Sequence, residues 1–310
     1  MRVLIILLLF FSNSILSQVE LINAKKPIDI ENKSNNEADP LQYFDVDEND
    51  ILWSKVVYEF IDLNEKLNFP LLFPTDEESQ TFRIGRKSMW VILKEHILTK
   101  IDEYKQTVPD AIWDVEMSPN NLEIYSDDTF EQSKKISVKD INDLISYEQV
   151  SRREAAGFVL KYVMSNQVGG YNIKGIWFFD KKASELKYRL LGIQPVVANT
   201  EDLKGGVPNP KLDKPTFWIW YPSIREELNK HLVFNERNNE NRITFDALLI
   251  NRRFNSYIYK YDNMYGDRSI KDYIVQRPGE SEESYRIRFI LESERIKKEI
   301  LDFENDMWGY

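Results

Sequence analysis

The chain has 310 residues, of which 51 are acidic and 41 basic, so its formal net charge is −10, and it contains no cysteine. This charge argues against duplex nucleic acid and anionic lipid surfaces as partners, because both are bound mainly through basic side chains. Without cysteine the sequence predicts no disulfides and no lipid attachment, so the fold must be held together by its core.

The first residues have the pattern of an export signal. Met1 and Arg2 precede an apolar run that is too short to span a bilayer, and small or polar residues follow it. We therefore interpret 1–17 as a signal peptide cleaved after Ser17 rather than as a membrane anchor. The polar, acidic and aperiodic segment 18–48 is expected to be a flexible arm, with Tyr43 and Phe44 as its candidate docking residues.

The segment 49–155 is predicted to be mainly helical. One helix is expected to begin at Ile51, with Asp50 as its N-cap, and to stop at the proline-containing stretch around Pro70. A second helix is expected over 86–100, then a short strand within 121–130, then a helix capped by Ser137. The apolar stripes are Trp53, Val56, Val57, Phe60 and Leu63 in the first helix, and Met89, Trp90, Leu93, Ile97 and Ile101 in the second.

The segment 156–310 is predicted to contain the sheet. Residues 157–164, 173–180 and 186–198 are rich in β-branched and aromatic residues, and turns are expected at 169–172 and 181–185. Residues 199–215 hold two glycines and three prolines and are predicted to be a loop. The aromatic segment 216–221 then enters the sheet, and Ser223 with Glu226 forms the capping box of the next helix.

Helices dominate the predicted C-terminus. A helix over Phe245–Arg252 and an extended stretch over 256–262 precede a last helix, which begins after Pro278-Gly279 with Ser281 as its cap. Its apolar face consists of Phe289, Ile296, Ile300, Phe303 and Met307. We therefore predict an α+β fold with a helical N-terminal part, a central mainly antiparallel sheet and C-terminal helices packing on it.

No motif in the sequence predicts catalysis or a cofactor. The two histidines, His96 and His231, lie in separate predicted helices, and no cysteine is present to complete a zinc site. Residues 45–50 resemble the start of an EF-hand loop but lack its glycine. Gly170 and Gly175 have P-loop spacing without the lysine that holds phosphate. Paired carboxylates fall in predicted loops and first helical turns. We expect a non-enzymatic protein without metal or cofactor.

Five long segments resemble the GldN family of gliding motility proteins of the Bacteroidetes, which is also called PorN. They begin at Asp50, Trp177, Phe217, Asp246 and Glu292, stand in the family's order, and extend together over roughly 50–308. The resemblance implies a periplasmic subunit of the type IX secretion system. It further implies a ring of many copies built with the outer-membrane lipoprotein GldK/PorK, and contact with the motor protein GldM/PorM. The family offers no catalytic residue to transfer.

Aromatic residues and arginine are enriched in the cores of protein interfaces, and this gives two candidate contact surfaces. The first consists of Trp177 to Tyr188 with Trp218, Trp220 and Tyr221, and the second of Arg252, Arg253, Phe254, Tyr257 and Tyr259. Alternatives stay open. Arg252 and Arg253 are equally consistent with closing a helix C-terminus. An exported carbohydrate-binding module would stack sugars on Trp218 and Trp220, and an exported hydrolase would need catalytic groups that the sequence does not display.

Overall fold

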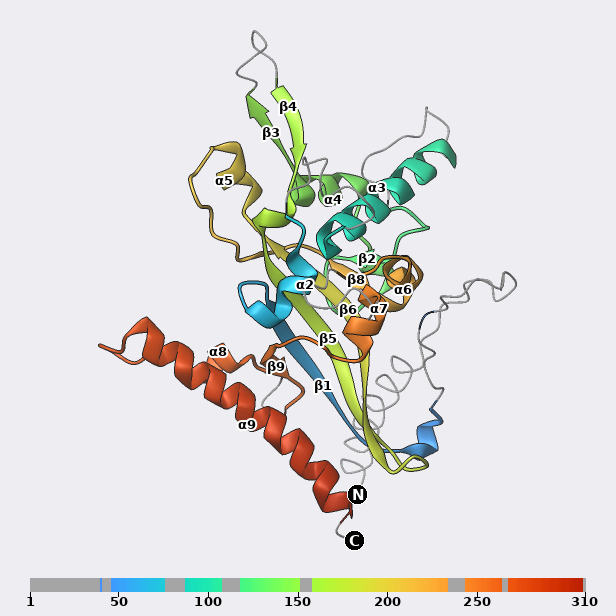
Figure 1. The fold of residues 1–310 in the computed structure, drawn as a ribbon, viewed down its shortest axis with the longest axis vertical. Coiled ribbons are helices and arrows are strands. Elements are labelled where there is room, and N and C mark those ends of the chain that lie inside the picture. Colours follow the sequence, from blue (N-terminus) through green and yellow to red (C-terminus); the bar gives the residue numbers. More distant parts are fainter. Residues whose placement is uncertain are drawn as a thin grey trace, which may run out of the picture.

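A computed structural model describes residue 40 and residues 46–75, 87–107, 118–150, 158–233, 243–263 and 267–308 (Figure 1). The expected signal peptide lies outside these residues, as does most of the expected arm, including Tyr43 and Phe44. In the described part, an antiparallel sheet runs through the middle of the molecule with helices packed against it. The predicted α+β class, the antiparallel sheet and the packing of the C-terminal helix on it are confirmed.

Three long neighbouring strands form the centre of the sheet. They are β1 (Ile51–Asp62), β5 (Val168–Asp180) and β6 (Glu185–Val197). The short strands are β2 (Ile124–Tyr125), β7 (Lys214–Pro215), β8 (Trp218–Trp220) and β9 (Tyr257–Tyr261), and the order is β2-β8-β6-β5-β1-β9 with β7 paired to β6. A separate two-stranded ribbon, β3 (Ser146–Val150) and β4 (Phe158–Tyr162), projects from one end of the molecule (Figure 1).

Helices pack against this sheet through two of its buried apolar clusters. The α-helices are α2 (Phe69–Leu72), α3 (Met89–Thr107), α4 (Val138–Ile145), α5 (Thr200–Lys204), α6 (Tyr221–Lys230), α7 (Phe245–Ile250), α8 (Ile270–Tyr273) and α9 (Glu282–Trp308). The short 3-10 turns are η1 (Glu48–Asp50), η2 (Lys66–Asn68), η4 (Gln132–Lys134) and η5 (Ser165–Gln167). The longest helix, α9, lies beside β9 and β1, whereas α3, α4, α6 and α7 gather near the other end of the sheet (Figure 1).

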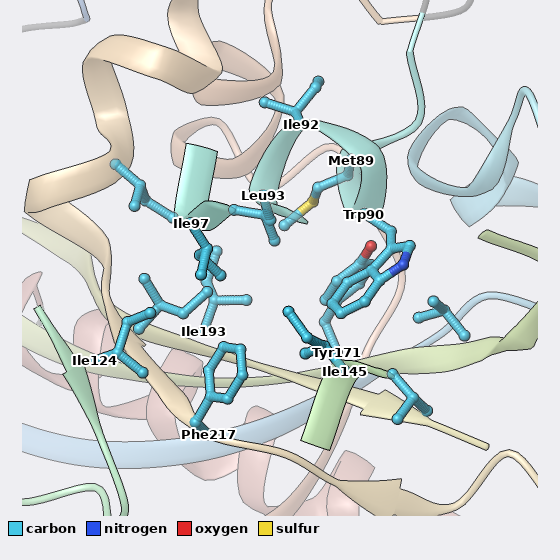
Figure 2. Packing of buried hydrophobic residues seen from close by; sticks show 14 of the residues in the cluster. Met89, Trp90, Ile92, Leu93, Ile97, Ile124, Ile145, Tyr171, Ile193 and Phe217 are labelled. Carbon is cyan, nitrogen blue, oxygen red and sulfur yellow. The ribbon is translucent and has the colours of Figure 1, made fainter. Parts of the chain in front are cut away.

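The main core lies between α3 and one face of the sheet. Met89, Trp90 and Leu93 of α3 pack toward Tyr171 of β5, together with Ile193 and Phe217 (Figure 2). The indole Nε1 of Trp90 donates a hydrogen bond of 2.8 Å to the carbonyl oxygen of Val163, so its one polar group is satisfied in the core. The helix predicted over 86–100 and its apolar face are confirmed in α3.

The last helix, α9, packs on a smaller cluster at the opposite edge. Phe289, Ile296 and Ile300 of the predicted apolar face are buried with Val57 of β1 and Ile258 of β9. Phe303, further along the same face, stacks on Trp53 with 4.6 Å between ring centroids. The hydroxyl of Ser281 accepts a hydrogen bond from the backbone N–H of Ser284, which confirms the predicted N-cap.

The helix predicted to begin at Ile51 is wrong, because this segment is strand β1. Val56 and Tyr58 are buried on one face of the sheet, and Val57 and Ile61 on the other. A strand covered on both faces shows no simple alternation, so periodicity did not separate it from a helix. Asp50 is therefore no N-cap but ends η1 and pairs with Lys182. The expected stop at Pro70 falls in the first turn of α2, where proline is tolerated.

The expected turn at 169–172 is also wrong, because these residues lie inside β5. Their glycines allow close approach rather than a reversal of the chain. A Cβ atom added to Gly170 would lie 2.3 Å from the carbonyl oxygen of Ile61, and one added to Gly169 would lie 2.1 Å from that of Leu212. The second expected turn, at 181–185, is confirmed at the end of the β5–β6 hairpin.

Two smaller predictions need correction. The expected loop 199–215 contains the five-residue helix α5, whose N-cap Asn199 accepts a hydrogen bond from the backbone N–H of Glu201. All its glycines and prolines come after Lys204, so they do not interrupt this helix. Helix α6 begins at Tyr221 rather than after a capping box at Ser223. The hydroxyl of Ser223 instead donates to the carbonyl oxygen of Trp220 at 2.7 Å.

Candidate interaction surface

The aromatic segment 216–221 forms strand β8 and the start of α6, as expected of a strand that enters the sheet. Trp218 and Trp220 point to one face, whereas Phe217, Ile219 and Tyr221 point into the main core. This alternation agrees with the pattern of the sequence. The two tryptophans are only 6% and 5% exposed, so they offer almost no surface to a partner of the folded chain.

Phe130, from the loop between β2 and η4, covers the two tryptophans. Its ring centroid lies 4.8 Å from that of Trp220 and 6.3 Å from that of Trp218. The ring fits because position 192 is glycine, where an added Cβ would lie 2.4 Å from the Phe130 Cζ atom. Phe130 itself has a φ of 57°, a conformation that L-residues rarely adopt. An open platform for stacking sugars, which the carbohydrate-binding alternative requires, is therefore not formed by Trp218 and Trp220.

A charged cluster fixes the loop that carries Phe130. The Lys174 ammonium donates to the Asp128 carbonyl oxygen at 2.6 Å and lies 3.4 Å from its carboxylate, which also accepts a hydrogen bond from the Tyr58 hydroxyl. Burial raises the pKa of Tyr58, and Asp128 raises it further. Burial lowers the pKa of Lys174 despite the nearby carboxylate. Burial acts to raise the pKa of Asp128, but Tyr58 and Lys174 outweigh it and hold the pKa low. The three groups satisfy one another, which suits a structural role.

The structure brings together members of the two predicted surfaces. The guanidinium of Arg252 lies 4.2 Å from the ring centroid of Tyr188, 5.2 Å from that of Trp177 and 5.4 Å from that of Phe254. Such distances are typical of cation–π contacts. Arg252 has a φ of 49°, so it follows α7 in a turn that directs its side chain toward the sheet.

Arg252 is also the partner of a buried acid. Its Nη2 atom lies 2.7 Å from a carboxylate oxygen of Glu59 in β1, and the Ser256 hydroxyl donates to the same oxygen. Burial opposes the charge of Arg252, but Tyr188 and Glu59 hold its pKa above the usual value. Glu59 is fully buried, so this arginine neutralises a charge inside the fold. The ion pair explains Arg252 better than a helix-closing role does.

The other members of the second predicted surface differ in exposure. Arg253 is exposed, and Tyr257 and Tyr259 are partly exposed. The ring of Tyr257 contacts Phe60 at 5.4 Å and Phe289 at 5.6 Å between centroids, so it helps to hold α9 against β9. Burial, with Asp62 nearby, raises its pKa to about 12. Arg253 therefore carries most of the surface charge that this set of residues presents.

Two apolar surfaces were missed at the sequence level. Three consecutive residues of β4, Phe158 to Leu160, are exposed by 68%, 43% and 55%, although the run reads as a buried strand. Four aliphatic residues on the outer side of α9 are exposed as well, namely Ile287, Ile290, Leu291 and Leu301. Their spacing of three, four and fourteen residues from Ile287, which places them on one side of a helix, was the available signal on α9. β4 offers no such signal.

Nothing in the described residues forms a reactive centre around the histidines. His231 lies 3.3 Å from the carboxylate of Glu227, and burial lowers the pKa of His96. In the ranges that the structure covers, His, Asp and Glu side chains form no group of three or more suited to hold a metal ion. Within the same ranges, no helix has both the length and the apolar character needed to cross a bilayer.

The chain was compared with known families and proteins. Residues 46–309 match the model of one family, described as gliding motility associated protein GldN. No curated protein sequence matches the chain. The match begins at Val46, before the first helical turn η1, and ends beyond α9. It therefore includes the sheet, the ribbon β3–β4 and all the described helices.

Proposed function

The chain belongs to the GldN family of gliding motility associated proteins, and from this we propose that it is a non-catalytic structural subunit of the type IX secretion and gliding machinery. In this proposal it resides in the periplasm at the inner side of the outer membrane. It forms a ring with a lipoprotein of the GldK/PorK kind and contacts a motor protein of the GldM/PorM kind. The observation that carries the proposal is the family match over 46–309, which includes nearly all described residues.

The ribbon β3–β4 supports an assembly role. In the described part of the chain, its two strands pair only with each other, and the ribbon projects from the body of the molecule (Figure 1). An isolated two-stranded ribbon is marginally stable in water, and open strand edges are templates for pairing with another chain. Phe158 and Val159 point to opposite faces of β4 and are both exposed. The ribbon therefore presents apolar surface on two sides, as suits an arm held between neighbouring subunits.

The edges of the main sheet are less open to such pairing. At the β9 edge, the backbone N–H of Ile258 donates to the hydroxyl of Ser293 in α9 at 2.7 Å. The backbone of Lys260 also forms an isolated antiparallel β-bridge with Ser269. At the other edge, the backbone of Tyr125 in β2 forms an isolated antiparallel β-bridge with Lys135. These contacts use edge groups that a neighbouring strand would otherwise take. Pairing through strand edges is thus favoured at the ribbon.

Arg253 is the proposed charged contact. It is exposed next to Arg252, which the fold already uses to neutralise Glu59. Exposed arginine at the rim of an interface contributes mainly to specificity and to the rate of association. We assign Arg253, with the partly exposed Tyr257 and Tyr259, to contact with another subunit of the assembly.

The proposal is tested by co-expressing the chain with a lipoprotein of the GldK/PorK kind from the same organism and purifying through a tag on the lipoprotein. We expect the two proteins to co-purify as large rings visible by electron microscopy, and an Arg253→Glu variant to give fewer closed rings with an unchanged unfolding curve. Lys139→Glu, at an exposed position of α4, is the matched control for the added negative charge. Failure of the unmodified chain to associate with the lipoprotein would overturn the proposed function.

A further inference from the structure

The outer face of α9 carries a regular pattern of its own. Its inner face, with Phe289, Ile296 and Ile300, is buried against the sheet. Directly opposite lie six exposed residues at alternating intervals of four and three, namely Ile287, Leu291, Glu294, Lys298, Leu301 and Asn305. This interval of 3.5 residues on average is the spacing of a coiled-coil seam. Nothing in the described part of the chain covers it, since all six side chains are exposed.

We propose that this outer face binds the same face of a second copy, as an antiparallel pair of helices. The two-fold axis crosses the outer face at the level of residue 296 along the helix. About that centre, Leu291 of one copy lies opposite Leu301 of the other, and Glu294 lies opposite Lys298. The outermost layers pair Ile287 with Asn305. When the six residues are written as a heptad repeat, each layer pairs an a position of one copy with a d position of the other. This is the pairing of antiparallel coiled coils, so the geometry agrees with the side-chain chemistry.

The charges select the antiparallel orientation. A parallel pair in register would still match leucine with leucine, but it would place Glu294 against Glu294 and Lys298 against Lys298. Like charges that face each other across an interface disfavour that pairing, whereas the antiparallel register forms two Glu–Lys pairs. The seam is therefore self-complementary in one direction only.

Within a single copy, the ion pairs along α9 do not use Lys298. Lys297 pairs with Glu294 at 2.9 Å, and Arg295 pairs with Glu292 and Glu299 at 2.7 and 3.1 Å. Lys298 pairs with no carboxylate among the described residues. Glu294 is only partly shielded by Lys297, since 59% of its side chain is exposed. A second copy would supply Lys298 with a partner without removing one of these existing pairs.

The pairing does not depend on the proposed function. A two-fold contact is complete at two copies, whereas a ring needs a different contact that repeats from copy to copy. The helix of 27 residues is about 40 Å long at 1.5 Å per residue, which is enough for the six layers of the seam. Two of the layers are Leu–Leu and two are charged, so the dimer is expected to be reversible rather than permanent.

The first test uses charge reversal with the chain alone, in the absence of any partner protein. Sedimentation equilibrium between about 1 and 500 μM should show a monomer–dimer equilibrium, a range that spans weak protein association. Glu294→Lys and Lys298→Glu should each raise the dissociation constant by about tenfold or more. The double variant, in which both charges are exchanged, should recover most of the dimer. The matched controls are Glu226→Lys in α6 and Lys139→Glu in α4, both exposed.

The second test fixes the register by disulfide formation, which is clean because the chain contains no cysteine. Equimolar Leu291→Cys and Leu301→Cys chains should form a disulfide-linked dimer under mild oxidation. Leu291→Cys alone should not, because its two copies would lie about 15 Å apart along the helix axes, beyond the reach of a disulfide. A monomeric chain at the highest concentration, a double charge variant that fails to recover, or equal cross-linking of Leu291→Cys alone would each overturn the proposal.

Discussion

The aromatic cluster around Trp220 and the surface of β4 are both dense in apolar residues, yet the fold uses them in opposite ways. Trp220 is covered by Phe130 and is 5% exposed, whereas Phe158 of β4 is 68% exposed. The aromatic run that stands out in the sequence is thus part of a core. The exposed apolar residues lie in a short segment that looks ordinary. In this molecule the unusual aromatic composition marks buried packing. The exposure of Phe158 to Leu160 follows from topology, because β4 pairs with the single strand β3 and lies outside the main sheet.

Removing a ring from the aromatic cluster should have the largest effect on stability. We expect Trp220→Ala to lower the free energy of unfolding by about 4 kcal/mol, because it leaves a cavity beneath Phe130. Leu52→Ala, at a half-exposed position of β1, should cost well under 1 kcal/mol and is the control. Urea unfolding followed by circular dichroism measures both. A Trp220→Ala cost close to that of the control would mean that the ring is not packed.

Breaking the buried ion pair should come next. We expect Arg252→Ala to cost about 3 kcal/mol, since it leaves the carboxylate of Glu59 buried without its cation. Arg253→Ala, one residue further but exposed, should change stability by less than about 0.5 kcal/mol. The double variant Glu59→Met/Arg252→Met should recover much of the lost stability, because no unpaired charge is then buried. If that double variant is no better than Arg252→Ala, the cost comes from packing around the guanidinium instead.

A smaller effect tests the contact between Gly192 and Phe130. We expect Gly192→Ala to cost about 2 kcal/mol, because the new Cβ would lie 2.4 Å from the Phe130 ring. In a Phe130→Ala background the same substitution should cost little, so the double-mutant cycle should show coupling of more than about 1 kcal/mol. Equal costs in both backgrounds would place the strain of the added methyl group elsewhere, for example in the strand β6.

Much of the fold could be predicted from the sequence, because its signals are local. Helices α3 and α9 have clear apolar faces and α9 has a serine cap, and the hairpin β5–β6 has a polar turn. Strand β1 could not be predicted in this way, because its two covered faces hide the alternation that identifies a strand. The alternation of Trp218 and Trp220 predicted which face they share. It did not predict that Phe130, from a distant loop, covers them.

The candidate surface was partly predictable for the same reason. Trp177, Tyr188 and Arg252 were selected for their residue types, and the structure places them in one cluster. What joins them is Glu59, and a single glutamate in a strand gives no sign in the sequence that it is buried. Its burial follows from the pairing of β1 with both β5 and β9, a contact between segments more than a hundred residues apart.

The ribbon should give the smallest effect on stability and therefore the sharpest contrast with the aromatic cluster. We expect the variant Phe158→Ser/Leu160→Ser to unfold within about 0.5 kcal/mol of the unmodified chain, since both side chains are already in water. If the ribbon is an assembly arm, the same variant should lose most of its association with the lipoprotein in the co-purification experiment. Val207→Ser, at another exposed apolar position, should lose none. A variant that assembles normally would remove β4 from the proposed contacts, and one that unfolds easily would show that the ribbon supports the fold rather than its partners.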